Sequence, residues 1–244
     1  MYPNDASGLF RVFSLPKPGE QYFLSADPTR NEGPTPDDAA FHVWRCKVPE
    51  QVAAFNGPVD PYSFADLIMA ACMIYNNGMA SIESENAGLG TCLRLVRELR
   101  WWNVYHHRKL HVSSNQLRDA QLGFPMNNDT KPEVITNAQR YVYELRPIIH
   151  DPATLDELEA YRREWDQEKG RYVDIPGVED NLAMACFQGL YIGNFYYKWF
   201  LRPNVKIASV LDQRPEVESI VDAPVEDPVF ATAPRLEQLL SFRG

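Results

Sequence analysis

Short apolar runs rich in strand-forming residues open the chain. Residues 21–27 (QYFLSAD) and 39–47 (AAFHVWRCK) are such runs, and a polar stretch containing proline and glycine separates them. This pattern predicts a hairpin of two strands with a long polar loop.

Helical spacing begins at Asp60-Pro61, which supplies a cap and a first-turn proline to the apolar stretch 63–76. Residues 79–84 (MASIES) follow as a short run typical of a buried strand. Asn86 can cap a further helix after it. A helix, a strand and a second helix are therefore expected in this order.

The second half of the chain predicts three more helices. Lys131-Pro132 starts a helix over residues 131–146. Thr154 and Glu157 match a capping box at the start of a charged helix over 154–169. The long apolar stretch 182–201 lacks proline and favours a packed final helix.

The division of the chain follows from these patterns and from its composition. With 244 residues, of which 45% are hydrophobic, the chain can bury one sizeable core. We expect one α/β domain over residues 1–206 and a tail over 207–244, extended or disordered, because the tail is rich in proline and acids without a period. No apolar run reaches the roughly 20 residues of a membrane helix, and a soluble intracellular protein is expected.

Cysteine spacing and phosphate-binding motifs exclude several classes of site. The four cysteines are scattered along the chain without a C-x-x-C pair. This spacing indicates buried free thiols rather than a zinc site or disulfides. The cysteines are Cys46, Cys72, Cys92 and Cys186. The sequence contains no G-x-x-x-x-G-K-[ST] motif, so no ATPase motor is expected in it.

Charge is distributed unevenly. The net charge of −9 disfavours nucleic-acid binding when taken alone. Basic residues nevertheless gather in one region of the sequence, together with three histidines. This region is either a local DNA-binding face or an ordinary solvated surface. The basic residues are Arg94, Arg97, Arg100, Arg108, Lys109 and Arg118.

Three acidic residues stand at the ends of predicted elements. Asp27 closes the first strand, Glu83 lies at the end of the strand MASIES, and Asp180 precedes the last helix. Carboxylates are hard ligands, and two Mg²⁺ or Mn²⁺ ions about 4 Å apart can hydrolyse a phosphodiester. The residues alone leave two interpretations open, a two-metal site and ordinary surface or capping charge.

At these residues the sequence resembles the nuclease domain of the phage terminase large subunit. LSADPTRNEG followed by DDAAFHVW is similar to the family's first strand, loop and second strand. Asp27 then corresponds to the first catalytic carboxylate, and Asp37 and Asp38 to auxiliary loop acids. In SIESENAG, Glu83 lies five positions before Gly88 and corresponds to the second carboxylate, with Glu85 as the competing ligand.

Two further motifs carry the resemblance. PGVEDNLAMACFQGL resembles the family's third motif, and Asp180 corresponds to the third carboxylate. Glu179 stands where histidine is usual, and Asn181 replaces a second aspartate as a possible neutral ligand. NNDTKPEVITNAQRYVYEL resembles the Thr-Lys-Pro helix start, where Lys131 can approach DNA; Arg108 and Lys109 are further DNA-binding candidates.

The resemblance implies an RNase H-like mixed sheet flanked by helices. It also implies a metal-dependent endonuclease that cleaves concatemeric double-stranded viral DNA with two Mg²⁺ or Mn²⁺ ions. The implied partners are DNA, the portal protein, the small terminase subunit and an ATPase domain that normally lies N-terminal to this region. The implied compartment is the host cytoplasm during phage assembly.

Two other interpretations remain open. Another RNase H-like nuclease, such as a junction resolvase or a transposase-type enzyme, would use the same carboxylates on DNA of a different shape. A non-catalytic packaging module would dock its acidic tail on a portal, and the carboxylates would then be structural.

Overall fold

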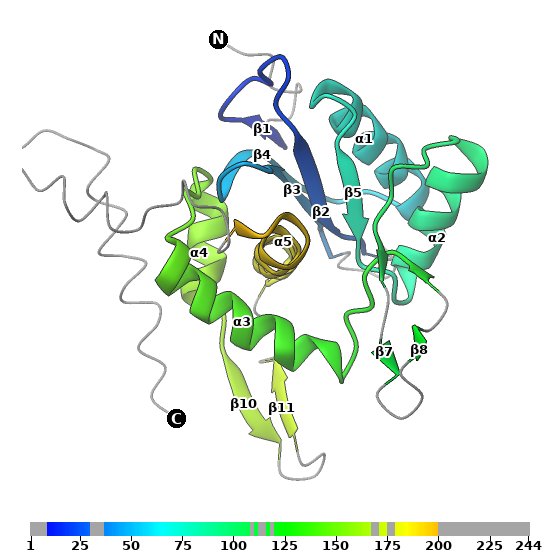
Figure 1. Cartoon of the computed structure of the whole chain (residues 1–244). Helices are drawn as coiled ribbons and strands as arrows, with labels where there is room; N and C mark the ends of the chain where they lie inside the picture. The colour runs from blue at the N-terminus through cyan, green and yellow to red at the C-terminus, as the bar shows by residue number, and fades with distance from the viewer. Residues whose placement is uncertain are drawn as a thin grey trace, which may run out of the picture.

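The centre of the molecule is a five-stranded mixed sheet (Figure 1). The computed structural model describes residues 9–29, 37–107, 110–111, 116–117, 120–166, 171–174 and 179–199. The expected tail over 207–244 lies outside these residues. Across the sheet the strands are β1 (Phe10–Val12), β4 (Glu50–Gly57), β3 (Ala39–Arg45), β2 (Tyr22–Asp27) and β5 (Met79–Ile82).

Strand direction follows the connections. The neighbours β1 and β4, β4 and β3, and β3 and β2 are antiparallel, whereas β2 and β5 are parallel. The predicted hairpin of β2 and β3 is confirmed, and so are the helix and strand that follow it. Parallel pairing brings the carboxyl ends of β2 and β5 to the same edge of the sheet.

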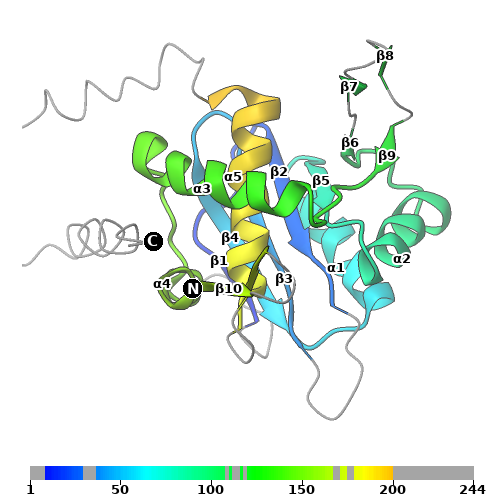
Figure 2. The same ribbon diagram turned by 90° about the horizontal axis from the view of Figure 1, so that it is seen from below.

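Helices cover both faces of the sheet (Figures 1 and 2). On one face lie α1 (Pro61–Ile74) and α2 (Ala87–Leu93), which continues into a π-helical turn, Arg94–Glu98. On the other face α5 (Asn181–Tyr197) lies along the strands, flanked by α3 (Thr130–Leu145) and α4 (Pro152–Ala160). The predicted α/β fold with a mixed sheet between helices is confirmed.

Close contacts fix α5 on the sheet. A Cβ atom at Gly189 would lie 2.3 Å from Trp44 Nε1, so only glycine allows this approach. Trp44 Nε1 donates a hydrogen bond to Ser25 Oγ (3.0 Å), which donates to the carbonyl oxygen of Ala185 (2.7 Å). Gln188 Nε2 donates to Ser81 Oγ (2.9 Å). The position of α5, and hence of the residues at its start, is therefore determined by the strands beneath it.

The charged helix expected over 154–169 is shorter than predicted. Asp151, not Thr154, caps α4, and its side chain accepts the Thr154 amide hydrogen. The helix ends at Ala160 because Tyr161 leaves the helical conformation and packs its buried ring on Phe187. The chain then forms a hairpin of β10 (Arg163–Asp166) and β11 (Arg171–Asp174), which the sequence pattern did not predict.

Two small antiparallel pairs lie beside the main sheet. These are β6 (His106–His107) with β9 (Gln121–Leu122), and β7 (Leu110–His111) with β8 (Gln116–Leu117). Arg108, Lys109 and Arg118 of the expected basic face lie outside the described residues. The described Arg94 is engaged in ion pairs with Asp66 and Glu98, which lowers its availability for DNA.

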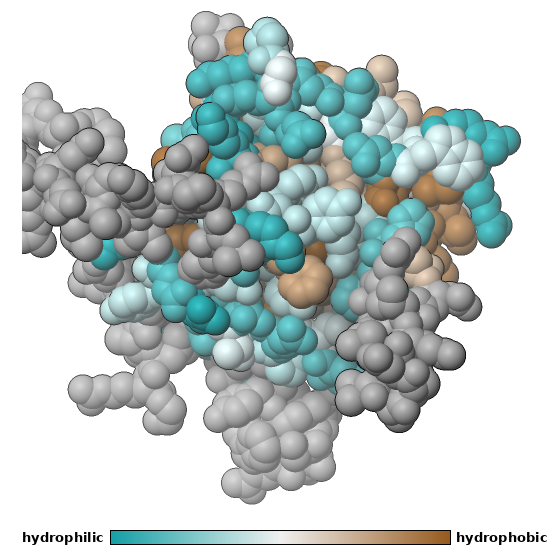
Figure 3. Space-filling model, viewed as in Figure 1, coloured by the Kyte–Doolittle hydropathy of each residue, from teal (hydrophilic) through white to brown (hydrophobic). Residues whose placement is uncertain are grey.

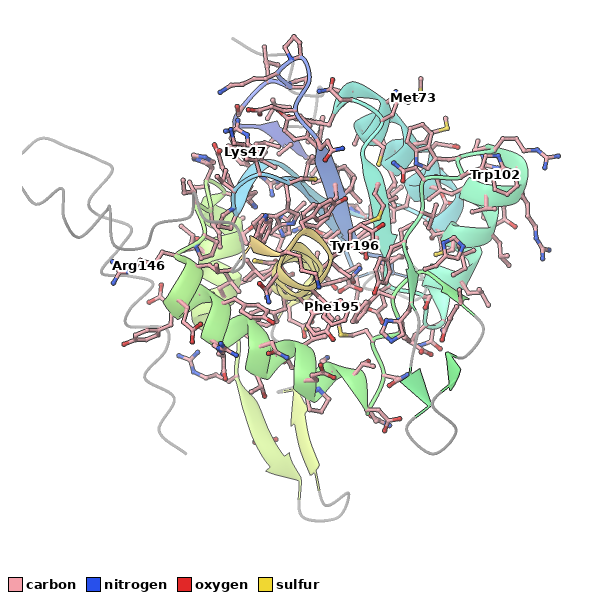
Figure 4. All side chains as sticks on the ribbon, viewed as in Figure 1. Lys47, Met73, Trp102, Arg146, Phe195 and Tyr196 are labelled. Carbon is pink, nitrogen blue, oxygen red and sulfur yellow. The ribbon has the colours of Figure 1, made fainter. Side chains whose placement is uncertain are left out.

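The visible surface is mainly hydrophilic, and hydrophobic groups gather over α1 and α2 in Figure 3. Phe195 and Tyr196 project from the last turn of α5 and are exposed (Figure 4). All four cysteines are free and buried, as predicted. Among the described residues, no helix combines the length and apolar character that a membrane crossing requires.

Candidate metal centre

Asp27 and Glu83 meet at one edge of the sheet. Asp27 is the last residue of β2, and Glu83 directly follows β5. The Glu83 amide donates to the carbonyl oxygen of Ala26 (2.9 Å), which continues the parallel ladder, and the Ser84 amide donates to Phe124 (2.8 Å). The backbone that carries Glu83 is thus tied on both sides.

The two carboxyl groups form a hydrogen-bonded pair. Burial raises the pKa of Asp27 well above its usual range, and the charge of Glu83 and a hydrogen bond to it raise the pKa further. Burial also raises the pKa of Glu83, although the hydrogen bond from Asp27 counteracts this. Asp27 therefore holds the proton and donates it to Glu83, because two adjacent ionised carboxylates would repel each other.

Asp180 lies within electrostatic range of this pair. It is the N-cap residue of α5, and its charge raises the pKa of both Asp27 and Glu83. Its side chain accepts no hydrogen bond from the first-turn amides of the helix. Three acids that are far apart in sequence are thus brought to one edge of the sheet.

Gly88 sets the position of Glu83. A Cβ atom at Gly88 would lie 1.6 Å from the carbonyl oxygen of Glu83, which no side chain permits. The Gly88 amide donates to the Glu85 carbonyl oxygen (2.9 Å). Asn86, at the N-cap of α2, has φ of 48° and makes no side-chain capping bond. The five-residue spacing from Glu83 to Gly88 therefore corresponds to a tight turn. In this turn the start of α2 packs directly against the backbone of Glu83.

Positive charge reaches the pair from α3. Lys131, in the first turn of this helix, lowers the pKa of both Asp27 and Glu83. Glu85 opposes this effect and raises the pKa of Glu83, while its Oε1 accepts a hydrogen bond from Asn127 Nδ2 (3.4 Å). Glu83, rather than Glu85, is the acid that contacts Asp27.

Of the other expected site residues, two precede a strand and one begins a helix. Asp37 and Asp38 directly precede β3. Burial raises the pKa of Asp38, and the charges of Glu179 and Asp37 raise it further. Asn181 is the first residue of α5. Arg108 and Lys109 lie outside the described residues.

The donor set suits a hard divalent cation. Carboxylate oxygens are the ligands that Mg²⁺ and Mn²⁺ prefer, and a cation can take the place of the proton that Asp27 and Glu83 share. In the described part of the chain, no three His, Cys, Asp or Glu side chains already converge closely enough to hold a metal ion. The arrangement is thus a hydrogen-bonded pair of carboxyl groups with a third acid nearby.

Glu157 is a neighbour of the site that the sequence pattern misassigned. Its Oε2 accepts a hydrogen bond from the Ala183 amide in α5 (3.1 Å) rather than capping its own helix. Burial raises the pKa of Glu157 to about 7, and repulsion from Asp180 and Glu179 adds to this. The Thr154–Glu157 spacing predicted that Glu157 caps its own helix, α4. In the structure Glu157 instead accepts an amide hydrogen of α5.

His42 is a second missed residue. It lies buried on β3 beneath α5, and its Nε2 donates to the Leu182 carbonyl oxygen (2.9 Å) while Nδ1 accepts from Gln51 Nε2 (2.8 Å). Burial lowers the pKa of His42 to about 4, which keeps the ring neutral. A lone histidine in an apolar strand carries no sequence signal for this role.

The fold is similar to that of solved phage proteins. No protein family and no curated protein matches the chain by sequence. The large terminase nuclease of thermophilic phage G20c, solved with cobalt, aligns with a TM-score of 0.61 at 15% identity, over 78% of this chain and 90% of that one. The form with magnesium gives 0.59, with the same identity and coverage.

A second phage gives the same result. The large terminase nuclease domain of Thermus phage P74-26 aligns with a TM-score of 0.56 at 16% identity, over 79% of this chain and 88% of that one. Each alignment spans most of both chains, so the sheet and its covering helices are shared as a whole. The chain therefore has the fold of a phage large terminase nuclease domain.

Proposed function

We propose that this chain is a metal-dependent endonuclease that cleaves concatemeric double-stranded DNA during phage genome packaging. The observation that carries the proposal is the hydrogen-bonded pair of Asp27 and Glu83, with Asp180 nearby, at one sheet edge of this fold. Acids whose pKa values are raised by burial and by charged neighbours are typical of functional sites. The known structures of this fold with bound magnesium and cobalt support a divalent cation.

Asp27, Glu83 and Asp180 would hold two Mg²⁺ or Mn²⁺ ions. When bound, such ions activate a water molecule and stabilise the leaving oxygen of a phosphodiester. The carboxyl pair must first release its shared proton, so we expect cation affinity to rise with pH. Glu85, Asn181, Asp37 and Asp38 are auxiliary ligand candidates.

Lys131 has two roles in this proposal. Its charge lowers the pKa of Asp27 and Glu83 and so eases the loss of their proton. It also places a cation where a DNA phosphate would approach the carboxylates. Arg108 and Lys109 remain proposed DNA contacts.

The wider role is part of the proposal and is supported by the likeness of the fold to phage large terminase nuclease domains. The proposed partners are double-stranded DNA, a portal protein, a small terminase subunit and an ATPase domain. The proposed compartment is the host cytoplasm during phage assembly. In the non-catalytic alternative, the acidic tail over 207–244 would dock on the portal. Co-purification of the full chain with portal and small subunit, with and without the tail, would test these assignments.

The first experiment is a cleavage assay on linear and supercoiled plasmid with Mn²⁺, Mg²⁺, Ca²⁺ or EDTA. We expect cleavage with Mn²⁺ or Mg²⁺, none with EDTA, and loss of cleavage in Asp180→Asn. The matched control is Asp156→Asn, which removes one exposed charge from α4 and should cleave normally.

Other outcomes would redirect the proposal. Cleavage that survives Asp180→Asn would refute the assignment of the third acid. Absence of cleavage with every metal would favour a non-catalytic packaging module. A marked preference for four-way junctions over linear DNA would favour a resolvase.

A further inference from the structure

The start of α5 lies at the candidate site, because Asp180 is the N-cap residue of this helix. The first amides of any helix lack partners within the helix, and the side chain of the N-cap residue usually accepts one of them. Aspartate is among the preferred residues for this role. Yet Asp180, although it occupies the N-cap position, makes no such bond.

Glu157 of α4 provides the missing acceptor. Its Oε2 accepts the Ala183 amide hydrogen at 3.1 Å. Ala183 is the third residue of α5, the position whose amide an N-cap side chain would ordinarily satisfy. The cap of this helix thus comes from a neighbouring helix rather than from its own N-cap residue.

The same turn is held from the opposite side by the sheet. His42 Nε2 donates to the carbonyl oxygen of Leu182 (2.9 Å), and Gln51 Nε2 donates to His42 Nδ1 (2.8 Å). Donation at Nε2 and acceptance at Nδ1 define one neutral tautomer of the ring. An amide and a carbonyl of the first turn are therefore both fixed by residues outside α5.

Gln51 links these two supports. Its Oε1 accepts the amides of His150 and Asp151, each at 2.9 Å, at the start of α4. Asp151 in turn forms a two-point ion pair with Arg11 on β1 (2.8 and 2.9 Å). The helix that carries Glu157 is thus anchored to the same strand residue that orients His42.

We propose that Glu157 acts as a substitute N-cap for α5, so that the Asp180 carboxylate is not required as the cap and can bind a divalent cation. This inference rests on the proposed function, since it assigns Asp180 to cation binding. Glu157 is a positioning residue in this scheme and is not itself a ligand. If Glu157 is lost, the Asp180 carboxylate can turn to the vacant amides and is withdrawn from the cation.

The test compares three substitutions at Glu157 with one control. Glu157→Ala removes the acceptor, Glu157→Asp keeps the charge but shortens the reach, and Glu157→Gln keeps the length and an acceptor oxygen without the charge. Asp156→Ala alters an exposed acid on the same helix. The readouts are Mn²⁺ affinity by electron paramagnetic resonance, melting temperature in EDTA, and plasmid cleavage.

We expect Glu157→Ala and Glu157→Asp to weaken Mn²⁺ binding by about tenfold or more, the range typical of residues that orient ligands. Glu157→Gln should retain Mn²⁺ binding close to the wild-type affinity, because the acceptor oxygen is kept. Asp156→Ala should leave Mn²⁺ affinity unchanged. Wild-type affinity in folded Glu157→Ala or Glu157→Asp would overturn the inference. Loss of Mn²⁺ binding in Glu157→Gln would also overturn the inference, because the negative charge of Glu157, rather than its hydrogen bond to the helix, would then determine the affinity.

A melting experiment in EDTA tests the capping exchange without any metal. Asp180→Ala should lower the melting temperature more in the Glu157→Ala background, where Asp180 has become the cap, than in the wild-type background. Equal effects in both backgrounds would refute the exchange. If the wild-type protein neither binds Mn²⁺ nor cleaves DNA, the proposed function fails, whereas the melting experiment still decides the capping role of Glu157.

Discussion

Gly88→Ala is the substitution with the sharpest structural consequence for the site. The added Cβ atom would lie 1.6 Å from the carbonyl oxygen of Glu83 and 2.7 Å from its carbonyl carbon, whereas real Cβ atoms stay beyond 3.0 Å. The oxygen or the start of α2 must therefore move by about 1.4 Å, the difference between the first and last of these distances. Neither group can rotate away, because both belong to the backbone.

The magnitude follows from this displacement. Overpacking of this kind destabilises a protein by about 1–3 kcal/mol. The Glu83 amide bonds Ala26 and the Ser84 amide bonds Phe124, so the strain passes into the segment that carries the carboxylate. A misplacement of about 1 Å can lower a reaction rate on the order of 100-fold. Gly88→Ala should thus lower both the melting temperature and the cleavage rate.

Gly90→Ala is the matched control. It lies in the same helix, two residues further on, and a Cβ atom there meets nothing within 4 Å. Alanine should be neutral or stabilise this helix by roughly 0.4–1 kcal/mol, since glycine loses more conformational freedom on folding. Both variants are compared by melting in EDTA and by plasmid cleavage with Mn²⁺. Wild-type stability and cleavage in Gly88→Ala would refute the reasoning.

Three further predictions concern the groups around the site. The pKa of His42 is about 4 when folded against 6.5 when exposed, so the unfolded chain binds the proton first. The free energy of unfolding should therefore fall by up to about 3 kcal/mol as pH drops through this window, and His42→Gln should flatten the fall in urea titrations. Asp151→Ala removes the α4 cap and the partner of Arg11, and should lower the free energy of unfolding by about 2–4 kcal/mol; a loss below 0.5 kcal/mol would contradict this. Because its folded pKa is raised, Asp27 destabilises the metal-free protein as pH rises, so Asp27→Asn should melt higher than wild type in EDTA at pH 8. An unchanged or lower melting temperature would contradict that sign.

Local patterns determined the elements with strong signals at their ends. The strands β2, β3 and β5 are apolar and bounded by turn residues, and α1 begins at the Asp60-Pro61 cap. By contrast, β4 (EQVAAFNG) was not predicted, because alanine, asparagine and glycine are poor strand formers. Its place between β1 and β3 comes from pairing with both neighbours, which no local window contains.

The segment after α4 shows the same limit. Its charged residues favour a helix when considered alone, yet β10 and β11 pair with each other and the helix ends where Tyr161 packs on Phe187. The capping box at Thr154 and Glu157 was wrong for a related reason. Asp151 is held by Arg11 from β1, so the start of α4 is set by a residue 140 positions away.

For the candidate site, the sequence determined which residue types are present and where each stands in its own element: acids at the ends of two strands and at the start of one helix. Only the tertiary structure decided that Asp27 is hydrogen-bonded to Glu83, that Asp180 lies nearby, and that Glu157 accepts the Ala183 amide hydrogen of α5. The physical reason is that capping and strand propensity act over a few residues, whereas electrostatic coupling and helix docking depend on distances that exist only after the chain has folded.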